Sequence, residues 1–123
     1  MEKELIKDNK QKNLVKGKKG EAEAIAFLEN EGYKIIETNF KTKLGEIDII
    51  AKDNENRIIF VEVKARDTAR FGYPREAVNN EKQRTIKRVA ELYLKIKKQT
   101  KAYTRFDVIE ILAGKITHIK NAF

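Results

Sequence analysis

The stretch that decides the fold is Gly45–Arg66, which reads GEIDIIAKDNENRIIFVEVKAR. Two apolar runs, IDIIA and IIFVEV, flank the polar turn DNEN, and this pattern predicts an antiparallel β-hairpin. The first strand also contains Glu46 and Asp48. The second contains Glu62 and Lys64, although IIFVEV is nearly continuous in apolar residues, as is typical of a strand buried on both faces. Charged side chains in the most apolar hairpin of the chain therefore need an explanation.

The alternating direction of side chains along a strand can bring these charged residues together on one face of the sheet. Successive side chains of a strand point to opposite faces, so Glu46 and Asp48 share one face, and Glu62 and Lys64 share another. A register that pairs Asp48 with Glu62 also pairs Glu46 with Lys64. This register requires an odd number of loop residues or a bulge, whereas an even loop places Asp48 opposite Val61 and disperses the cluster. We expect the clustered register.

The carboxylates in this cluster favour a metal site. Like charges side by side in a low dielectric cannot all ionise without a cation. Clustered carboxylate oxygens suit Mg²⁺ or Mn²⁺, so the spacing predicts such a site around Asp48 and Glu62. The alternative that stays open is a solvated sheet face carrying cross-strand ion pairs.

A helix is predicted before the hairpin, over residues 14–31, with Gly32 in the position that ends it. At 3.6 residues per turn, Glu21 falls between Ile25 and Leu28, inside the apolar stripe. We expect its carboxyl group to reach the same sheet face as the charged cluster. The alternative is a first-turn glutamate that only interacts favourably with the helix dipole.

A second helix is predicted after the hairpin. Asn80 and Gln83 resemble a capping box, and the helix is expected to run to about Lys98. Lys82 projects beside Ile86 at the start of the inward stripe, so we expect it to turn toward the sheet. The alternative is a lysine whose aliphatic stem covers the edge of the core while its ammonium group stays in water.

The remaining elements predict an α/β (α+β) fold, namely a mixed central sheet flanked by helices. Further strands are expected at residues 33–40, 104–112 and 115–123, which gives the order αβββαββ. Residues 14–123 are expected to form a single domain. Residues 1–13 are polar and lysine-rich, and predict a flexible basic arm.

Composition narrows the partners and the chemistry. The 123 residues carry a net charge of +8 and have a pI of about 9.6, which favours a polyanion such as nucleic acid. The absence of cysteine excludes disulfides and thiolate metal sites, and the single histidine, His118, excludes paired-histidine nucleases. His118 is expected to be an ordinary strand residue. No signal peptide or apolar run of about 20 residues is present, so a soluble cytoplasmic protein without membrane contact is expected.

Several segments together resemble a known family. The spacing Asp-x13-Glu-x-Lys, at Asp48, Glu62 and Lys64, resembles the active-site signature of PD-(D/E)XK nucleases, the restriction-endonuclease-like superfamily. The segments GKKGEAEAIAFLENEGYKII, GEIDIIA, FVEVKAR, AVNNEKQ, RFDVIEI and NAF resemble the YraN-like family of small bacterial proteins over residues 17–123. Members of that family are similar in fold to archaeal Holliday-junction resolvases.

The resemblance implies a restriction-endonuclease-like αβββαβ core and assigns roles to individual residues. Asp48, Glu62, Lys64 and Glu21 take the catalytic positions of the resolvase-like enzymes. Asp48 and Glu62, the backbone carbonyl of Val63, and Glu21 are the expected ligands of Mg²⁺ or Mn²⁺. Lys64 is expected to orient the attacking water or to stabilise the charge of the transition state.

The function expected from these features is Mg²⁺-dependent, structure-selective hydrolysis of phosphodiester bonds in branched DNA. The expected nucleic-acid contacts are Arg66, Lys82, Arg84 and Lys87, with DNA favoured over RNA. Resolvase-like relatives act as dimers, so a homodimer is compatible with this function. Two alternatives stay open: a non-catalytic nucleic-acid-binding module on the same fold, and a protein–protein adaptor.

Overall fold

The computed structural model describes residues 19–66 and 78–123. The predicted basic arm, the start of the first helix and the polar loop around Pro74 lie outside the described residues. The described chain contains an N-terminal helix covering residues 19–30, followed by β1 (Lys34–Lys41), β2 (Glu46–Lys52), β3 (Ile58–Arg66), α2 (Asn80–Ile96), β4 (Thr104–Leu112) and β5 (Lys115–Ile119). The predicted order of helices and strands is confirmed.

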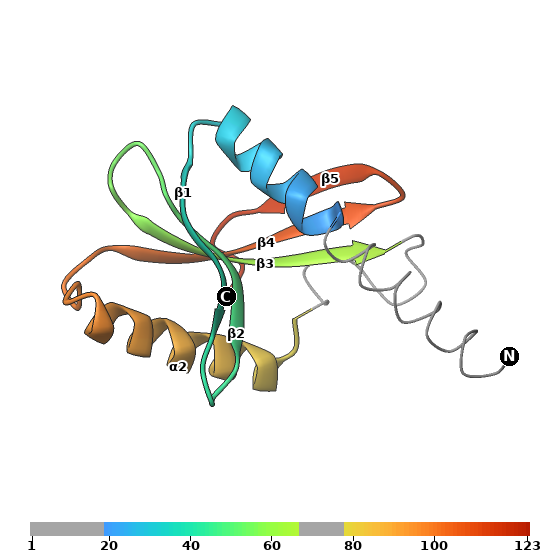
Figure 1. Cartoon of the computed structure of the whole chain (residues 1–123). Helices are drawn as coiled ribbons and strands as arrows, with labels where there is room; N and C mark the ends of the chain where they lie inside the picture. Colours follow the sequence, from blue (N-terminus) through green and yellow to red (C-terminus); the bar gives the residue numbers. More distant parts are fainter. Residues whose placement is uncertain (1–18, 67–77) are drawn as a thin grey trace, which may run out of the picture.

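The five strands form one mixed sheet in the order β1-β2-β3-β4-β5 (Figure 1). Strands β3 and β4 are parallel, and the other three neighbouring pairs are antiparallel. A parallel pair needs a crossover connection, and α2 lies in the connection between β3 and β4. The prediction of a mixed sheet flanked by helices is confirmed.

The two helices cover opposite faces of the sheet (Figure 1). On one face, α2 packs its side chains against Phe60 of β3 and Val108 of β4, with Tyr93 as the largest buried side chain. On the other face, the N-terminal helix contributes Ala24 and Leu28 to a second apolar cluster with the opposite side chains of β2, β3 and β4. Burial on both faces explains why IIFVEV is almost entirely apolar.

The β2–β3 hairpin has the predicted register. Lys52 pairs with Ile58 and Ile49 with Val61, so the loop between the strands holds five residues, an odd number. Continuing this register by one residue places Asp48 next to Glu62. The ladder itself ends at the Ile49–Val61 pair, and β2 and β3 separate beyond it.

The helix ends differ in how well they were predicted. Gly32 ends the N-terminal helix as expected: its φ is +93°, and the following Tyr33 N–H donates to the Leu28 carbonyl at 2.9 Å. The predicted cap of α2 at Asn80 is wrong by one residue. Asn79 has the extended backbone of an N-cap, and its side-chain oxygen accepts a hydrogen bond from the Lys82 N–H at 2.8 Å.

The C-terminal strand is shorter than predicted. It ends at Ile119 rather than Phe123, because Asn121 adopts φ +53° and the Ala122 N–H donates to the Phe106 carbonyl at 2.7 Å. Among the described residues, no helix is long and apolar enough to cross a membrane.

Candidate active site at the end of the β2–β3 hairpin

The site begins where β2 and β3 separate. Asp48 Oδ2 accepts a hydrogen bond from the Val63 N–H at 2.8 Å, so a side-chain carboxylate serves as acceptor just beyond the last ladder pair. Glu62, the preceding residue of β3, is buried, with only 5% of its surface exposed. The hairpin register therefore places the two carboxyl groups side by side.

Two ammonium groups lie close to the buried glutamate. Lys82 Nζ lies 2.8 Å from Glu62 Oε1, and Lys64 Nζ lies 3.8 Å from the same oxygen. Lys64 comes from β3, whereas Lys82 comes from the first turn of α2 on the same sheet face. Lys82 thus turns toward the sheet, as its place in the apolar stripe predicts. The Asn79 cap fixes the backbone of Lys82 in this position.

The charged groups of the site have pKa values that depart from their ordinary values in different directions. Burial raises the pKa of Asp48 to about 6, and the negative charge of Glu62 adds to this rise, while Lys82 opposes it. Burial and the neighbouring charge of Lys82 lower the pKa of Lys64. Burial alone would lower the pKa of Lys82, but the hydrogen bond and charge of Glu62 outweigh it and raise that pKa. Lys82 is therefore the lysine of this site whose positive charge is stabilised.

Glu21 approaches from the other layer of the molecule. Its helix packs on the face opposite α2, but its carboxyl group interacts electrostatically with both Asp48 and Glu46, so its expected reach to the charged cluster stays a prediction. A Cβ at Gly20 would lie 2.8 Å from the Cβ of Ala65, so this glycine lets the helix lie directly on the end of β3. Burial and the charge of Asp48 raise the pKa of Glu21, and the Asn39 side chain offsets part of this rise.

The Glu21 carboxyl group is also incompletely satisfied. Its Oε1 atom is buried and accepts no hydrogen bond from the described residues. A buried carboxylate oxygen without a donor is costly, and such a group is a candidate ligand for a cation. No direct contact joins Glu21 to Asp48, and the two carboxyl groups interact through their charges.

The GEID segment brings the start of β2 close to α2. A Cβ at Gly45 would lie 2.6 Å from Cγ2 of Thr85, so only glycine permits this approach. Glu46 pairs with Lys41 of β1. The expected pair between Glu46 and Lys64 does not form, because the β2–β3 ladder ends before it.

These elements enclose an open hollow of about 400 Å³ between the hairpin and the start of α2. Its lining combines the charged side chains of the site with the first turn of α2: Gly45, Glu46, Asp48, Glu62, Asn79, Glu81, Lys82, Thr85 and Ile86. The two central carboxyl groups and Lys82 therefore line the same hollow.

The donor set fits a hard divalent cation only in part. Asp48 and Glu62 supply carboxylate oxygens, which Mg²⁺ and Mn²⁺ prefer, and Glu21 adds a buried oxygen that has no hydrogen-bond partner among the described residues. However, within residues 19–66 and 78–123 no group of three or more Asp, Glu, His or Cys side chains is arranged to hold a metal ion. The described chain thus presents two adjacent carboxylates rather than a complete cage.

The other predicted nucleic-acid contacts lie in different surroundings. The Nε of Arg66 donates to Glu110, and only 15% of the Arg66 side chain is exposed, so this residue is held within the sheet face. Arg84 lies exposed on the outer side of α2. Lys87 is also exposed, and its ammonium group lies 5.9 Å from the centre of the Phe106 ring. Only Lys82 joins the carboxylate cluster directly.

Sequence reasoning missed Glu110. It is fully buried in β4, in register with Lys64, and its Oε2 atom has no hydrogen-bond partner among the described residues. The signal for it was present, because a glutamate interrupts the apolar run DVIEIL.

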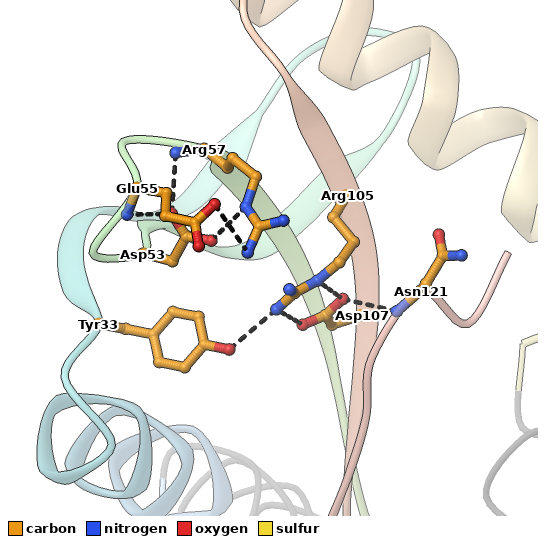
Figure 2. A network of polar contacts seen from close by, with 7 residues as sticks. All are labelled: Tyr33, Asp53, Glu55, Arg57, Arg105, Asp107 and Asn121. Atoms are coloured by element: carbon orange, nitrogen blue, oxygen red, sulfur yellow. Dashed lines mark hydrogen bonds and ion pairs between the residues drawn. The ribbon is translucent and has the colours of Figure 1, made fainter.

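A further buried acid, Asp107, lies on the other sheet face, in register with Val61 of β3, and belongs to the polar network drawn in Figure 2. Arg105 donates to both of its oxygens at 2.8 Å, and the Asn121 N–H donates to Oδ1 at 3.0 Å. His118 Nε2 lies 2.7 Å from Oδ2. Burial alone would raise the pKa of Asp107, but the hydrogen bonds from His118 and Arg105 lower it. His118, expected to be an ordinary strand residue, is thus part of a buried network.

The family assignment rests on most of the chain. A family model described as "Uncharacterised protein family UPF0102" matches residues 20–111, which include every catalytic residue proposed from the sequence. The chain belongs to the UPF0102 family. This agrees with the YraN-like resemblance of its sequence segments.

Other UPF0102 proteins align over nearly their whole length. The protein from Thermodesulfovibrio yellowstonii is 52% identical over 108 residues, covering 87% of this chain and 94% of the relative. The protein from Caldicellulosiruptor saccharolyticus is 48% identical over 113 residues, covering 87% and 95%. The protein from Persephonella marina is 46% identical over 110 residues, covering 89% and 93%.

One solved structure, described as an EndoMS–dsDNA2 complex, is similar in fold. The similarity covers 76% of this chain and 34% of that chain, with a TM-score of 0.42 and 19% sequence identity. At this level, the function of the UPF0102 chain has to come from its own residues.

Proposed function

We propose that this UPF0102 protein is a metal-dependent, structure-selective nuclease that hydrolyses phosphodiester bonds in branched DNA. The observation that carries the proposal is the pair of adjacent carboxyl groups of Asp48 and Glu62, which line one open hollow together with Lys82. The ammonium group of Lys64 lies 3.8 Å from Glu62. The net charge of +8 supports a polyanionic substrate. The PD-(D/E)XK resemblance of the same residues supports the reaction.

Asp48 and Glu62, with the Val63 carbonyl, would hold Mg²⁺ or Mn²⁺, and Glu21 would complete the ligand set. The bound ion would supply an acidified water and neutralise charge on the phosphate. Asp48 suits this task because its carboxylate is destabilised by burial beside Glu62, as its raised pKa of about 6 indicates. A cation at this position relieves that repulsion.

The two lysines take different roles. Lys64 has a lowered pKa because of burial and the charge of Lys82, so it gives up a proton more readily than an ordinary lysine. We assign it to orienting and deprotonating the attacking water. Lys82 remains charged through its hydrogen bond to Glu62, and its ammonium group is suited to contact a phosphate oxygen.

A second candidate function is a non-catalytic DNA-binding module. Two observations favour it: no three metal-binding side chains converge in the described part of the chain, and Lys82 already neutralises Glu62 without a metal. The basic charge serves binding equally well in either case, so binding alone does not separate the two functions.

Cleavage of labelled four-way junction, flap and linear duplex DNA, with Mg²⁺, Mn²⁺ or EDTA, separates them. For a nuclease we expect metal-dependent cleavage of branched DNA, reduced about 100-fold or more in Asp48→Asn and Lys64→Met with DNA binding retained. Glu29→Gln and Lys115→Met, both exposed and distant in sequence from the site, are the matched controls. Salt-sensitive binding without cleavage in either metal indicates the module. No binding at low salt contradicts both functions and leaves the adaptor.

A further inference from the structure

A second hollow, of about 430 Å³, lies at the opposite end of α2 from the candidate active site. Three lysines from three different elements line it: Lys52 ends β2, Lys98 follows the C-cap of α2, and Lys101 lies in the connection to β4. The other lining residues are polar or apolar, namely Asn56, Gln99, Thr100, Ile58 and Ala102, and none is acidic. We refer to it as the lysine hollow.

The charges of the lysine hollow are not compensated internally. In the part of the chain that the structure describes, Lys52, Lys98 and Lys101 form no ion pair with a carboxylate, unlike Lys82 with Glu62. Lys52 also stands in cross-strand register with Lys34, and such like-charge pairs destabilise a sheet. A lysine near a helix C-terminus interacts favourably with the helix dipole, but this accounts only for Lys98. Three like charges around one hollow favour an anionic ligand.

A basic stripe along α2 connects the lysine hollow with the candidate active site. Arg84, Arg88, Lys95 and Lys98 recur at intervals of three to seven residues on the exposed side of the helix. One acidic residue, Glu91, lies within this stripe. The helix has 17 residues, so the two hollows are separated by about 25 Å at 1.5 Å per residue. That span corresponds to about seven nucleotides along one strand of duplex DNA at 3.4 Å each.

We propose that the lysine hollow binds backbone phosphates of the DNA that occupies the candidate active site, about seven base pairs from the phosphodiester bond beside Asp48. The inference rests on the proposed function in that one DNA molecule reaches both sites. Contacts of this kind read charge and spacing and carry no base sequence. The substrate is therefore a branched DNA with at least one duplex arm longer than about seven base pairs.

The experiment measures binding of branched DNA whose duplex arms range from about 4 to 14 base pairs, in EDTA, so that no cleavage takes place. For the wild-type protein we expect affinity to rise once an arm exceeds about seven base pairs and then to level off. The double variant Lys98→Asn, Lys101→Gln should lose this rise, bind long arms about tenfold or more weakly, and bind 4-base-pair arms as the wild type does. The slope of log K against log salt should fall by about two.

The substitutions are chosen to preserve the fold. Lys98 has φ +56°, a conformation that asparagine tolerates better than most residues, and Lys101 lies exposed in a turn. Lys115→Gln, Lys120→Gln removes the same charge from exposed positions at β5 and is the matched control. The control should weaken binding slightly and equally at all arm lengths.

Three results would overturn the inference. The first is an equal loss for both double variants at every arm length, which indicates a general charge effect. The second is wild-type affinity that does not depend on arm length. The third is a pair of observations that indicates a site for small anions. The NMR signals of the Lys98 and Lys101 amides shift saturably when inorganic phosphate is added, and the affinity for DNA does not depend on arm length. If binding depends on arm length but no DNA is cleaved, the phosphate-binding role of the lysine hollow is supported and the nuclease function is contradicted. If DNA is cleaved but binding does not depend on arm length, the nuclease function is supported and the role of the lysine hollow is contradicted.

Discussion

Two aspartates of the sheet, the fully buried Asp107 and the partly buried Asp48, have opposite electrostatic surroundings. Asp107 accepts hydrogen bonds from Arg105 and from the Asn121 N–H (Figure 2). It also lies 2.7 Å from His118, and these contacts lower its pKa despite burial. Asp48 accepts a hydrogen bond from a backbone N–H as well, but its nearest charged neighbour is Glu62. Burial and that neighbour raise its pKa to about 6.

The difference separates a structural acid, Asp107, from a candidate functional acid, Asp48. A buried carboxylate with cationic partners stabilises its surroundings only as part of a complete network, and removing one member leaves an uncompensated charge. A buried carboxylate beside another carboxylate costs stability and gains from any cation that binds there. Strongly perturbed acids in open hollows are therefore candidates for functional sites, and Asp48 meets that description.

The largest effect on stability is expected at the structural acid. Asp107→Ala leaves Arg105 and His118 buried without their partner, so we expect it to lower the free energy of unfolding by about 3–5 kcal/mol. Urea denaturation at pH 7 measures this. Because the pKa of Asp107 is lowered in the folded state, its contribution is present above its ordinary value of 3.8 and is lost as the pH falls through the folded pKa. A loss below about 1 kcal/mol would show that the network contributes little.

The next largest effect on stability is expected from a metal ion bound at the candidate functional acid, Asp48. Mn²⁺ at about 100 times its dissociation constant should raise the free energy of unfolding of the wild-type protein by about 2.7 kcal/mol. Thermal denaturation with and without Mn²⁺ measures this. Asp48→Asn should lose the effect, whereas the exposed-acid control Glu29→Gln should keep it. Equal stabilisation of all three proteins would place the metal elsewhere.

A gain in stability is expected when the charge of Asp48 is removed. Asp48→Asn retains an oxygen for the Val63 N–H and abolishes the repulsion with Glu62, so we expect about 2 kcal/mol of added stability at pH 8 without metal. The folded pKa of about 6 exceeds the ordinary 3.8, so the wild type loses stability through this group as the pH rises from about 4 to about 6. The advantage of the variant should disappear near pH 4. Denaturation curves at several pH values test this, and a variant that is less stable at pH 8 would contradict it.

The smallest effect concerns the residue that positions Lys82. Asn79→Ala removes the N-cap of α2 and should cost about 1 kcal/mol, with a further rise in the pKa of Asp48 as Lys82 becomes less constrained. Asn80→Ala, one residue further on, is the control and should cost less than about 0.5 kcal/mol. Carboxyl NMR titration and urea denaturation measure the two effects. A larger cost at Asn80 would place the cap where the sequence predicted it.

Local patterns predicted the hairpin well. Alternation of apolar and charged residues, together with an odd loop, sufficed to place Asp48 beside Glu62, because side-chain direction in a strand depends only on the backbone repeat. Helical periodicity likewise sufficed to turn Lys82 toward the sheet. The cap of α2 was misplaced because two adjacent asparagines satisfy the same preference, and only the extended backbone of Asn79 distinguishes them.

The sheet face that the N-terminal helix covers could not be predicted from periodicity along the sequence. Periodicity shows that Glu21 faces inward, but an inward direction is the same for a helix on either face of a sheet. In the structure the helix lies opposite α2, where Gly20 permits close packing on Ala65. Glu21 comes from this helix, and the charge of Asp48 contributes to its raised pKa.

The sequence by itself determined the order of the strands and, given an odd loop, the β2–β3 register that brings Asp48 beside Glu62, because these follow from repeats along the chain. Only the tertiary structure decided which buried acids are compensated. Arg105 neutralises Asp107 from two positions away, but His118 and Asn121 reach it from β5 and beyond, and Lys82 reaches Glu62 across 20 residues of chain. The charge state of a buried group depends on its neighbours in space. These neighbours distinguish Asp48 from Asp107, although the two aspartates look alike in the sequence.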